Sequence, residues 1–216
     1  MEKKVFDRFR DLIFQTSGIS LSDQKVALVS ARIGKRMRVL DAPDFNAYFE
    51  LVVADKSGAE LRELLNAIST NVTHFYREKR HFEFMGQRVR EMSGNGTRRL
   101  RIWCAACSTG EEPYTIAMTV LEHARNPVSL KIIASDISTK VLQLAKLGIY
   151  KDTDLTNIPP PLLKKYFQIG VGRADRLYRV KPSLREAVTF QQINLSTPPY
   201  PVEGGLDMIF CRNVMI

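Results

Sequence analysis

The sequence predicts an α/β protein of the doubly wound, Rossmann-like class, preceded by an all-helical domain. Apolar residues recur every three or four positions through most of the first hundred residues, as they do on one face of a helix. Beyond Gly96, short apolar runs alternate with helical segments. Apolar strands that alternate with helices indicate a parallel sheet with helices on both faces.

The helical domain is predicted over residues 1–75, followed by a linking helix over residues 76–96. The first helix of the domain ends at Gly18. Pro43 suits the first turn of a third helix, and residues 57–69 form a fourth. Between the first and third helices, a second helix has an apolar face that consists of Val26, Val29, Ile33, Met37 and Leu40.

The alternating part, residues 97–216, is predicted to contain four strands and two helices. The helices cover residues 111–124 and 138–150. YFQIG and LYRVK lie on either side of a turn with glycines, which predicts a small antiparallel β-subdomain inserted at about residues 166–188. The strands cover residues 99–106, 130–136, 188–195 and 206–213.

Composition limits the class of protein. A chain of 216 residues that is 44% hydrophobic can bury a substantial core. Its apolar runs are shorter than a membrane span, and its amphipathic N-terminus does not resemble a signal peptide, so we expect a cytoplasmic protein. The net charge of +9 is concentrated at the front, where residues 1–40 hold nine basic and four acidic residues.

Basic residues form a stripe on the second helix. Lys25, Arg32 and Arg36 are spaced so that they lie on one side of it. Two interpretations are open: an ordinary solvated face, or a docking surface for an acidic partner.

Cys104 and Cys107 have the CxxC spacing of redox and zinc sites. A redox pair needs its thiols at a helix N-terminus, and zinc needs two further ligands. The pair overlaps a strand, and the three histidines show no ligand spacing. The pattern therefore favours small buried residues and no metal.

Polar residues lie at the ends of the four predicted strands. Because the carboxyl ends of parallel strands meet at one edge of a sheet, these residues are expected to share a crevice. They are Glu111, Asp136, Asn194, Arg212 and Asn213.

The turn CSTGEE indicates the ligand of that crevice. It has one glycine instead of the three of a dinucleotide-binding turn, and it places carboxylates where a phosphate would bind N–H groups. Asp136 lies where such folds place the acid that binds ribose hydroxyls. S-adenosylmethionine (SAM) fits, with its ribose at Asp136 and its ammonium group at Glu111. Glu112, before Pro113, is interpreted as a helix-capping residue.

A second polar cluster, ISTNVTHFYREKRHF at residues 68–82, lies where the two domains meet. Its spacing brings Asn71, Thr73 and Arg77 close together. Thr73 has two open interpretations, as a site residue or as the N-cap of the linking helix.

Four segments resemble the signatures of the bacterial chemotaxis receptor methyltransferases, the CheR family. They are ISTNVTHFYRE, AACSTGEEPYTIAM, ASDISTKVLQLAKLGIY and FCRNVMI, in that order and spacing. The resemblance covers nearly the whole chain. It implies methyl transfer from SAM to glutamate side chains on the cytoplasmic helices of chemoreceptors, which yields glutamate methyl esters and S-adenosylhomocysteine.

The resemblance also assigns parts of the chain to roles. The helical domain corresponds to a receptor-docking domain, and the β-subdomain to one that binds a receptor's C-terminal tail peptide in some members. The sheet has about four of the family's seven strands, so C-terminal strands are expected to be missing. The implied cofactor contacts are Asn71, Thr73, Arg77, Glu111, Asp136, Asn194, Leu195, Arg212 and Asn213.

The reaction itself makes modest demands. A free glutamate titrates near 4.3, so the acceptor carboxylate is already a nucleophile at neutral pH, and the enzyme mainly has to orient it. Arg77 is the predicted catalytic residue, because its guanidinium group suits the acceptor carboxylate.

Two alternatives are weighed against this function. TPPY at residues 197–200 is similar to the (D/N)PPY motif of nucleic acid methyltransferases, but it precedes the fourth strand instead of ending it. A base-flipping enzyme also needs aromatic stacking partners there, and only Tyr200 is available. A non-enzymatic SAM-binding or receptor-binding scaffold is disfavoured because Arg77, Glu111 and Asp136 are all present.

Overall fold

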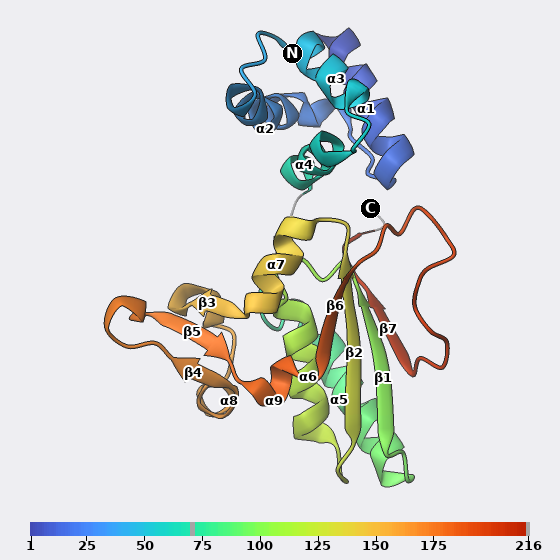
Figure 1. The fold of residues 1–216 in the computed structure, drawn as a ribbon. Helices are drawn as coiled ribbons and strands as arrows, with labels where there is room; N and C mark the ends of the chain where they lie inside the picture. The colour runs from blue at the N-terminus through green and yellow to red at the C-terminus, as the bar shows by residue number, and fades with distance from the viewer. Residues whose placement is uncertain (70–71, 215–216) are drawn as a thin grey trace. The chain divides into compact units, whose positions relative to one another are not determined.

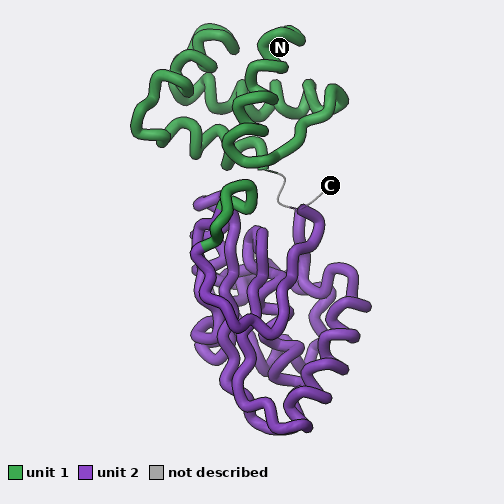
Figure 2. Tube along the Cα trace, turned by 90° about the vertical axis from the view of Figure 1, so that its right-hand side faces the viewer, with its two compact units in different colours: residues 1–70, 194–200 green, residues 71–193, 201–216 purple. Residues whose placement is uncertain are grey.

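The computed structural model describes residues 1–69 and 72–214 (Figure 1). The chain divides into two compact units (Figure 2). The helical unit contains Met1–Thr70 and Asn194–Tyr200, and the sheet unit contains Asn71–Ile193 and Pro201–Ile216.

The helical unit confirms the predicted all-helical front. Its apolar faces meet in a core where Phe6, Phe9, Ile13, Ile33 and Leu64 are fully buried. A short 3-10 turn, η1 Asp23–Lys25, leads into the second of its helices. The helices are α1 Lys3–Ser17, α2 Val26–Val39, α3 Phe45–Ala54 and α4 Ala59–Ile68.

Local chemistry sets the ends of these helices. α1 ends at Gly18, whose φ of 71° lies in the left-handed region that glycine adopts without strain. α3 begins at Phe45 because the Asp44 carboxylate accepts a hydrogen bond from the Ala47 N–H group at 2.9 Å. Pro43 therefore precedes the helix, so its predicted place in the first turn was wrong.

A parallel sheet forms the centre of the sheet unit, in the order β6-β2-β1-β7 (Figure 1). Its strands are β1 Arg99–Ala105, β2 Ser129–Asp136, β6 Val188–Gln192 and β7 Met208–Cys211, which confirms the predicted strands. The chain moves from β1 to β2 and β6, then returns to β7 on the other side of β1. Folds of this kind bind ligands beyond the strand ends at such a reversal.

Three helices of the sheet unit share a core with one face of the sheet. They are α5 Arg80–Gly94, α6 Glu111–His123 and α7 Thr139–Leu147, and their buried side chains belong to one core with Ile102 and Cys104 of β1. Crossovers between parallel strands are right-handed, and both β1-α6-β2 and β2-α7-β6 run in one direction across the sheet. Both crossover helices therefore lie on the same face, although the sequence predicts helices on both.

A small antiparallel sheet, ordered β3-β5-β4, confirms the predicted β-subdomain. Its strands are β3 Ile149–Lys151, β4 Phe167–Ile169 and β5 Leu177–Val180. β3 was not expected, because its residues were assigned to the preceding helix, and α7 instead ends at Gly148 with a φ of 62°. The flanking elements are η2 Asp152–Leu155, α8 Pro160–Tyr166, η3 Gly172–Ala174 and α9 Pro182–Arg185.

The β-subdomain is anchored to α6. Glu122 Oε1 accepts hydrogen bonds from Lys165 Nζ at 2.6 Å and from Tyr166 Oη at 2.5 Å. Phe167 packs edge-on against Phe75, with ring centroids 5.8 Å apart. Strands this short need such support to stay ordered.

In the described part of the chain, none of the helices combines the length and apolarity that crossing a membrane requires.

Candidate active site

The loop between β1 and α6 makes a tight turn at the carboxyl edge of the sheet. Ala106 and Ser108 have φ of 60° and 48°, and Gly110 has a φ of 97°. A Cβ atom at Gly110 would lie 2.9 Å from both the Ala145 Cβ and the Tyr150 Oη. Both the backbone angle and the lack of space therefore require glycine at this position.

Asp136 ends β2 and faces this turn. The Ser108 N–H group donates to its Oδ2 at 2.8 Å, and the Ser138 N–H group donates to its Oδ1 at 2.9 Å. The residue is only 7% exposed, and burial raises the pKa of its carboxyl group, although the backbone donors act in the opposite direction. The Ile137 N–H group also acts to lower this pKa, and because a carboxylate has about four acceptor positions, Asp136 keeps capacity for a further donor.

Glu111 is the first residue of α6 and is also 7% exposed. The Thr109 hydroxyl lies 2.9 Å from its Oε1 and 2.7 Å from its Oε2. Burial raises the pKa of Glu111, and the Thr109 hydrogen bond opposes that shift. The Tyr150 hydroxyl fixes Thr109 by donating to its carbonyl oxygen at 2.8 Å. Glu111 is thus a buried carboxylate with spare acceptor capacity.

Arg77 lies in a turn that precedes α5. Its Nη1 donates to the Val72 carbonyl oxygen at 2.7 Å. Because α5 begins at Arg80 with Lys79 as its N-cap, Thr73 is not the cap of this helix, and that interpretation was wrong. Asn71, the third predicted member of this cluster, lies outside the described residues.

Arg212 and Asn213 follow β7, and both side chains bind Glu78. Arg212 Nη2 donates to Glu78 Oε2 at 3.0 Å, and Asn213 Nδ2 donates to Glu78 Oε1 at 3.2 Å. Arg212 Nη2 also donates to the Arg77 carbonyl oxygen at 2.5 Å. Its two donors lower the pKa of Glu78. Sequence reasoning did not single out Glu78, although it lies beside Arg77 in the same motif.

Glu112 has a further role besides the helix start predicted for it. It lies in the first turn of α6, and its Oε2 is 3.3 Å from Arg212 Nη1. Burial raises the pKa of Glu112, while Arg212 and Arg77 act to lower it. Glu112 is therefore the buried counter-charge of Arg212, whose side chain is only 10% exposed.

Asn194 and Leu195 belong to the helical unit, whereas Glu111 and Asp136 belong to the sheet unit. The Asn194 Nδ2 donates to the Thr16 carbonyl oxygen at 2.7 Å, so its side chain is turned to the end of α1. The predicted contact of Asn194 and Leu195 with the cofactor stays a prediction.

The basic stripe of α2 has contacts within its own unit. Arg36 binds both oxygens of Glu60, with Nε–Oε1 and Nη2–Oε2 distances of 2.7 and 2.6 Å. Arg32 Nη1 donates to carbonyl oxygens at the C-terminus of α4, including that of Ile68 at 2.6 Å. Lys25 is exposed.

The other motifs of the sequence have structural roles. Cys104 and Cys107 are free and buried, and burial raises the pKa of both thiols, which disfavours a reactive thiolate. The interpretation as small buried residues is confirmed. TPPY, residues 197–200, lies in a loop between β6 and β7, as expected.

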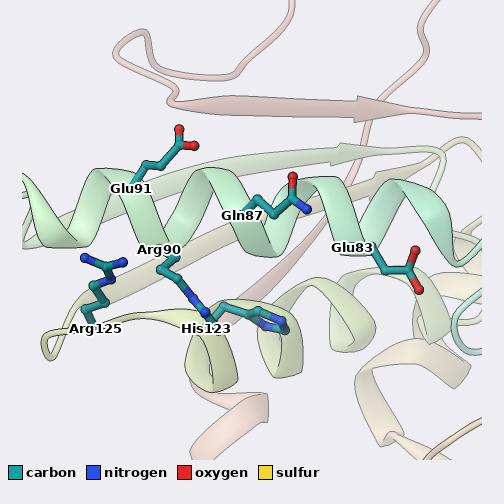
Figure 3. Close-up of a pocket in the computed structure, with 6 residues that line it drawn as sticks. All are labelled: Glu83, Gln87, Arg90, Glu91, His123 and Arg125. Carbon is teal, nitrogen blue, oxygen red and sulfur yellow. The ribbon is translucent and has the colours of Figure 1, made fainter.

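A surface groove of about 460 Å³ lies between α5 and α6 (Figure 3). It lies at the His123 end of α6, about 18 Å along the helix from Glu111. Its two acidic residues pair elsewhere, Glu83 with Lys79 and Glu91 with Arg88. The groove is thus separate from the acidic pair, and its lining consists of Glu83, Gln87, Arg90, Glu91, His123 and Arg125.

Two family models match the chain. The CheR methyltransferase, SAM binding domain matches residues 71–216, and the CheR methyltransferase, all-alpha domain matches residues 4–69. The chain belongs to the CheR methyltransferase family. CheR membership confirms SAM as the methyl donor and confirms the predicted methyltransferase activity.

Several curated chemotaxis enzymes are similar over almost the whole chain. The chemotaxis protein methyltransferase of Escherichia coli (strain K12) is 42% identical over 212 residues, which cover 98% of this chain and 73% of that protein. Chemotaxis protein methyltransferase 2 of Pseudomonas aeruginosa is also 42% identical, with 98% and 75% covered. That of Borreliella burgdorferi is 36% identical, with 99% and 77% covered. These CheR relatives do not favour the nucleic acid alternative.

Proposed function

We propose that this CheR-family chain transfers the methyl group of SAM to glutamate side chains of chemoreceptors, forming glutamate methyl esters and S-adenosylhomocysteine. The observation that carries the proposal is the pair of buried carboxylates, Glu111 and Asp136, beside a glycine turn at the carboxyl edge of a parallel sheet. The relatives named as chemotaxis protein methyltransferases support the choice of acceptor.

The acidic pair fits SAM. Asp136 accepts backbone N–H groups at both oxygens and keeps capacity for a ribose hydroxyl. Glu111 has a hydroxyl partner in Thr109 and suits an ammonium group as its counter-charge.

Chemistry at the site requires orientation more than proton transfer. SAM supplies a sulfonium-bound methyl group that a carboxylate oxygen displaces, with the electron pair of the broken carbon–sulfur bond remaining on sulfur. We propose that Arg77 orients the acceptor carboxylate, since a guanidinium group matches a carboxylate in charge and shape. The remaining proposed cofactor contacts are Asn71, Thr73, Arg77, Asn194, Leu195, Arg212 and Asn213.

The proposed partner is the acidic surface of receptor cytoplasmic helices, which places the reaction in the cytoplasm. The helical domain, proposed as residues 1–75, would dock there through exposed bases at α2, such as Lys25 at its N-cap. Arg32 and Arg36 of the predicted stripe already have partners inside their unit. Docking by the stripe is therefore expected to depend mainly on Lys25.

A receptor tail peptide is a second proposed contact, at the edge strand β4 of the β-subdomain. Ile169 and Val171 are 66% and 84% exposed along this edge. β4 pairs with β5 on one side, and backbone groups alternate in direction along an antiparallel strand. The groups of Ile169 that point away from β5 suit the addition of an extended peptide.

Transfer of tritium from methyl-labelled SAM tests the proposed function. Receptor cytoplasmic fragments, DNA and tRNA are offered in parallel, with Glu111→Gln as the impaired variant and Glu83→Gln as a control on an exposed carboxylate. We expect base-labile label on the receptor fragment alone, as a methyl ester requires. Label on nucleic acid, or SAM binding without any transfer, would reject the proposal.

A further inference from the structure

Three non-glycine residues at the end of β7 and the turn before α5 have left-handed backbone angles. Tyr76, Glu78 and Asn213 have φ of 56°, 57° and 56°. The left-handed conformation costs an L-residue free energy, and such residues persist only where their surroundings hold them. The contacts around Glu78 show what holds Glu78 and Asn213 here.

Glu78 is bound through both carboxylate oxygens. Oε2 accepts from Arg212 and Oε1 accepts from Asn213. Two consecutive residues after β7 thus hold one side chain of the turn that carries Arg77. A hydrogen bond is stronger when its donor or acceptor is charged, and two bonds to one carboxylate fix its orientation as well as its position.

Arg212 extends these contacts to three parts of the sheet unit. Its guanidinium group binds Glu78, the Arg77 carbonyl oxygen and Glu112 of α6, and it lies 5.2 Å from the centre of the Phe82 ring of α5. A mostly buried guanidinium group needs counter-charges, and Glu78 and Glu112 supply them. Loss of either carboxylate leaves Arg212 with a single acidic partner.

We propose that Glu78 is a positioning residue for methyl transfer, and we call Glu78, Arg212, Asn213 and Glu112 the Glu78 clasp. The clasp holds the Tyr76–Glu78 turn against the end of β7, and this fixes the backbone from which the Arg77 side chain extends. The catalytic part of this inference rests on the proposed function, whereas the positioning part concerns the backbone alone.

Glu78→Gln is the sharpest test, because glutamine keeps the size of the side chain and removes its charge. Glu83→Gln is the matched control, since Glu83 is an exposed carboxylate in the first turn of α5 whose ion pair with Lys79 is 3.5 Å long. The full chain is used throughout.

Hydrogen exchange tests the positioning part without any catalysis. In Glu78→Gln we expect the amides of residues 75–80 to exchange about tenfold faster than in the parent chain, because one charge-assisted contact of the turn is lost. Glu83→Gln should leave them unchanged. Unchanged exchange in Glu78→Gln overturns the proposal, and this result does not depend on whether receptors are the substrate.

Kinetics test the catalytic part. With saturating SAM and receptor fragment, we expect kcat of Glu78→Gln to fall about tenfold, because the clasp orients Arg77. The melting temperature should stay within about 2 °C of the parent, because the Glu78 side chain is 44% exposed and Arg212 keeps its pairing with Glu112. Asn213→Ala, which removes one donor to Glu78, should produce a smaller fall in kcat.

Faster exchange with an unchanged kcat rejects the catalytic role. If the parent chain itself transfers no methyl group to receptors, the proposed function fails, and the exchange result still decides the positioning role.

Discussion

Two buried glutamates show how the two units of the chain use charge. Glu60, in the helical unit, is 9% exposed, and its carboxylate binds the Arg36 guanidinium group through both oxygens and the Tyr48 hydroxyl at 2.7 Å. Glu111, in the sheet unit, is 7% exposed, and the Thr109 hydroxyl binds its oxygens. No ion pair involves Glu111 among the contacts of the described residues.

The difference separates a structural charge from a binding charge. A buried ion is costly unless it is paired and hydrogen-bonded, and Glu60 meets both conditions. Burial raises the pKa of Glu111, which means that the folded chain holds this carboxylate in an environment that disfavours its charge. Such a cost is typical of functional sites, where a ligand supplies the missing partner.

Removing the structural charge should have the largest effect on stability. Glu60→Ala leaves the guanidinium group of Arg36 and the buried hydroxyl of Tyr48 without their acceptor, so we expect the helical unit to lose about 3 kcal/mol of unfolding free energy. Native-state hydrogen exchange of α2 and α4 amides measures this loss. Glu63→Ala, an exposed site on the same helix, should cost less than about 0.5 kcal/mol. Equal losses in the two variants would contradict the structural role of Glu60.

Removing the binding charge should affect affinity and leave stability intact. Glu111→Gln keeps the size of the side chain and removes the proposed partner of the SAM ammonium group, so the dissociation constant for SAM should rise about 10- to 100-fold. Because burial disfavours the charged carboxylate, the cofactor-free variant should melt no earlier than the parent chain. Calorimetric titration and thermal unfolding measure both quantities. A dissociation constant within twofold of the parent value would remove Glu111 from the site.

The raised pKa values of Glu111 and Asp136 predict a pH dependence for the same site. As pH falls through a raised pKa, the carboxyl group takes up a proton and loses its charge, so SAM affinity should weaken up to tenfold per pH unit below that pKa. The stability of the cofactor-free chain changes in the opposite sense. The folded state binds these protons more tightly than the unfolded state, so their contribution favours folding as pH falls and is lost as pH rises through the folded pKa.

Titrations of SAM from neutral pH down to the lowest pH at which the chain stays folded measure this dependence. In Glu111→Gln the pH dependence should become shallower, because one of the two titrating groups is gone. A parent chain whose SAM affinity stays constant over this range would contradict the prediction.

The sequence predicted most of the fold because the short apolar runs of its strands differ clearly from the periodic apolar pattern of its helices. The runs RLRIWCAA and LKIIASD are apolar and short, and both became strands of the parallel sheet. β3 was missed because GIY continues the apolar pattern of α7, and only the left-handed angle of Gly148 separates the two elements. α6 and α7 cover the same face of the sheet because both crossovers are right-handed and run in one direction. The periodicity of apolar residues carries no information about this handedness.

The place of a site residue was predictable where it depends only on the end of a neighbouring strand. Glu111 and Asp136 follow strands, so sequence position alone placed them at the edge of the sheet. Glu78 and Arg212 are 134 residues apart in the chain, and their pairing depends on β7 lying beside β1 and on the turn before α5. In the same way, Arg36 has the spacing of an exposed stripe, and its pairing with Glu60 on α4 depends on how the helices pack. Contacts between distant segments require the fold to be known first.

Lys25 represents a third kind of charge, an exposed one outside the ion pairs of the described residues. Reversal of its charge should have the smallest effect on activity. Charge reversal at Arg36 would also break its ion pair with Glu60, so a weaker receptor interaction of that variant would have two causes. Lys25 is exposed at the start of α2, and Lys25→Glu should raise KM for the receptor fragment about threefold, with SAM affinity and melting temperature unchanged. Lys56→Glu makes the same change of net charge in the exposed connection between α3 and α4 and should leave KM unchanged.

Equal increases in KM would indicate a general attraction between a basic unit and an acidic receptor, and the increases should then disappear together at high salt. An increase confined to Lys25→Glu locates the docking surface at the start of α2, because only a local contact distinguishes two exposed lysines of the same unit.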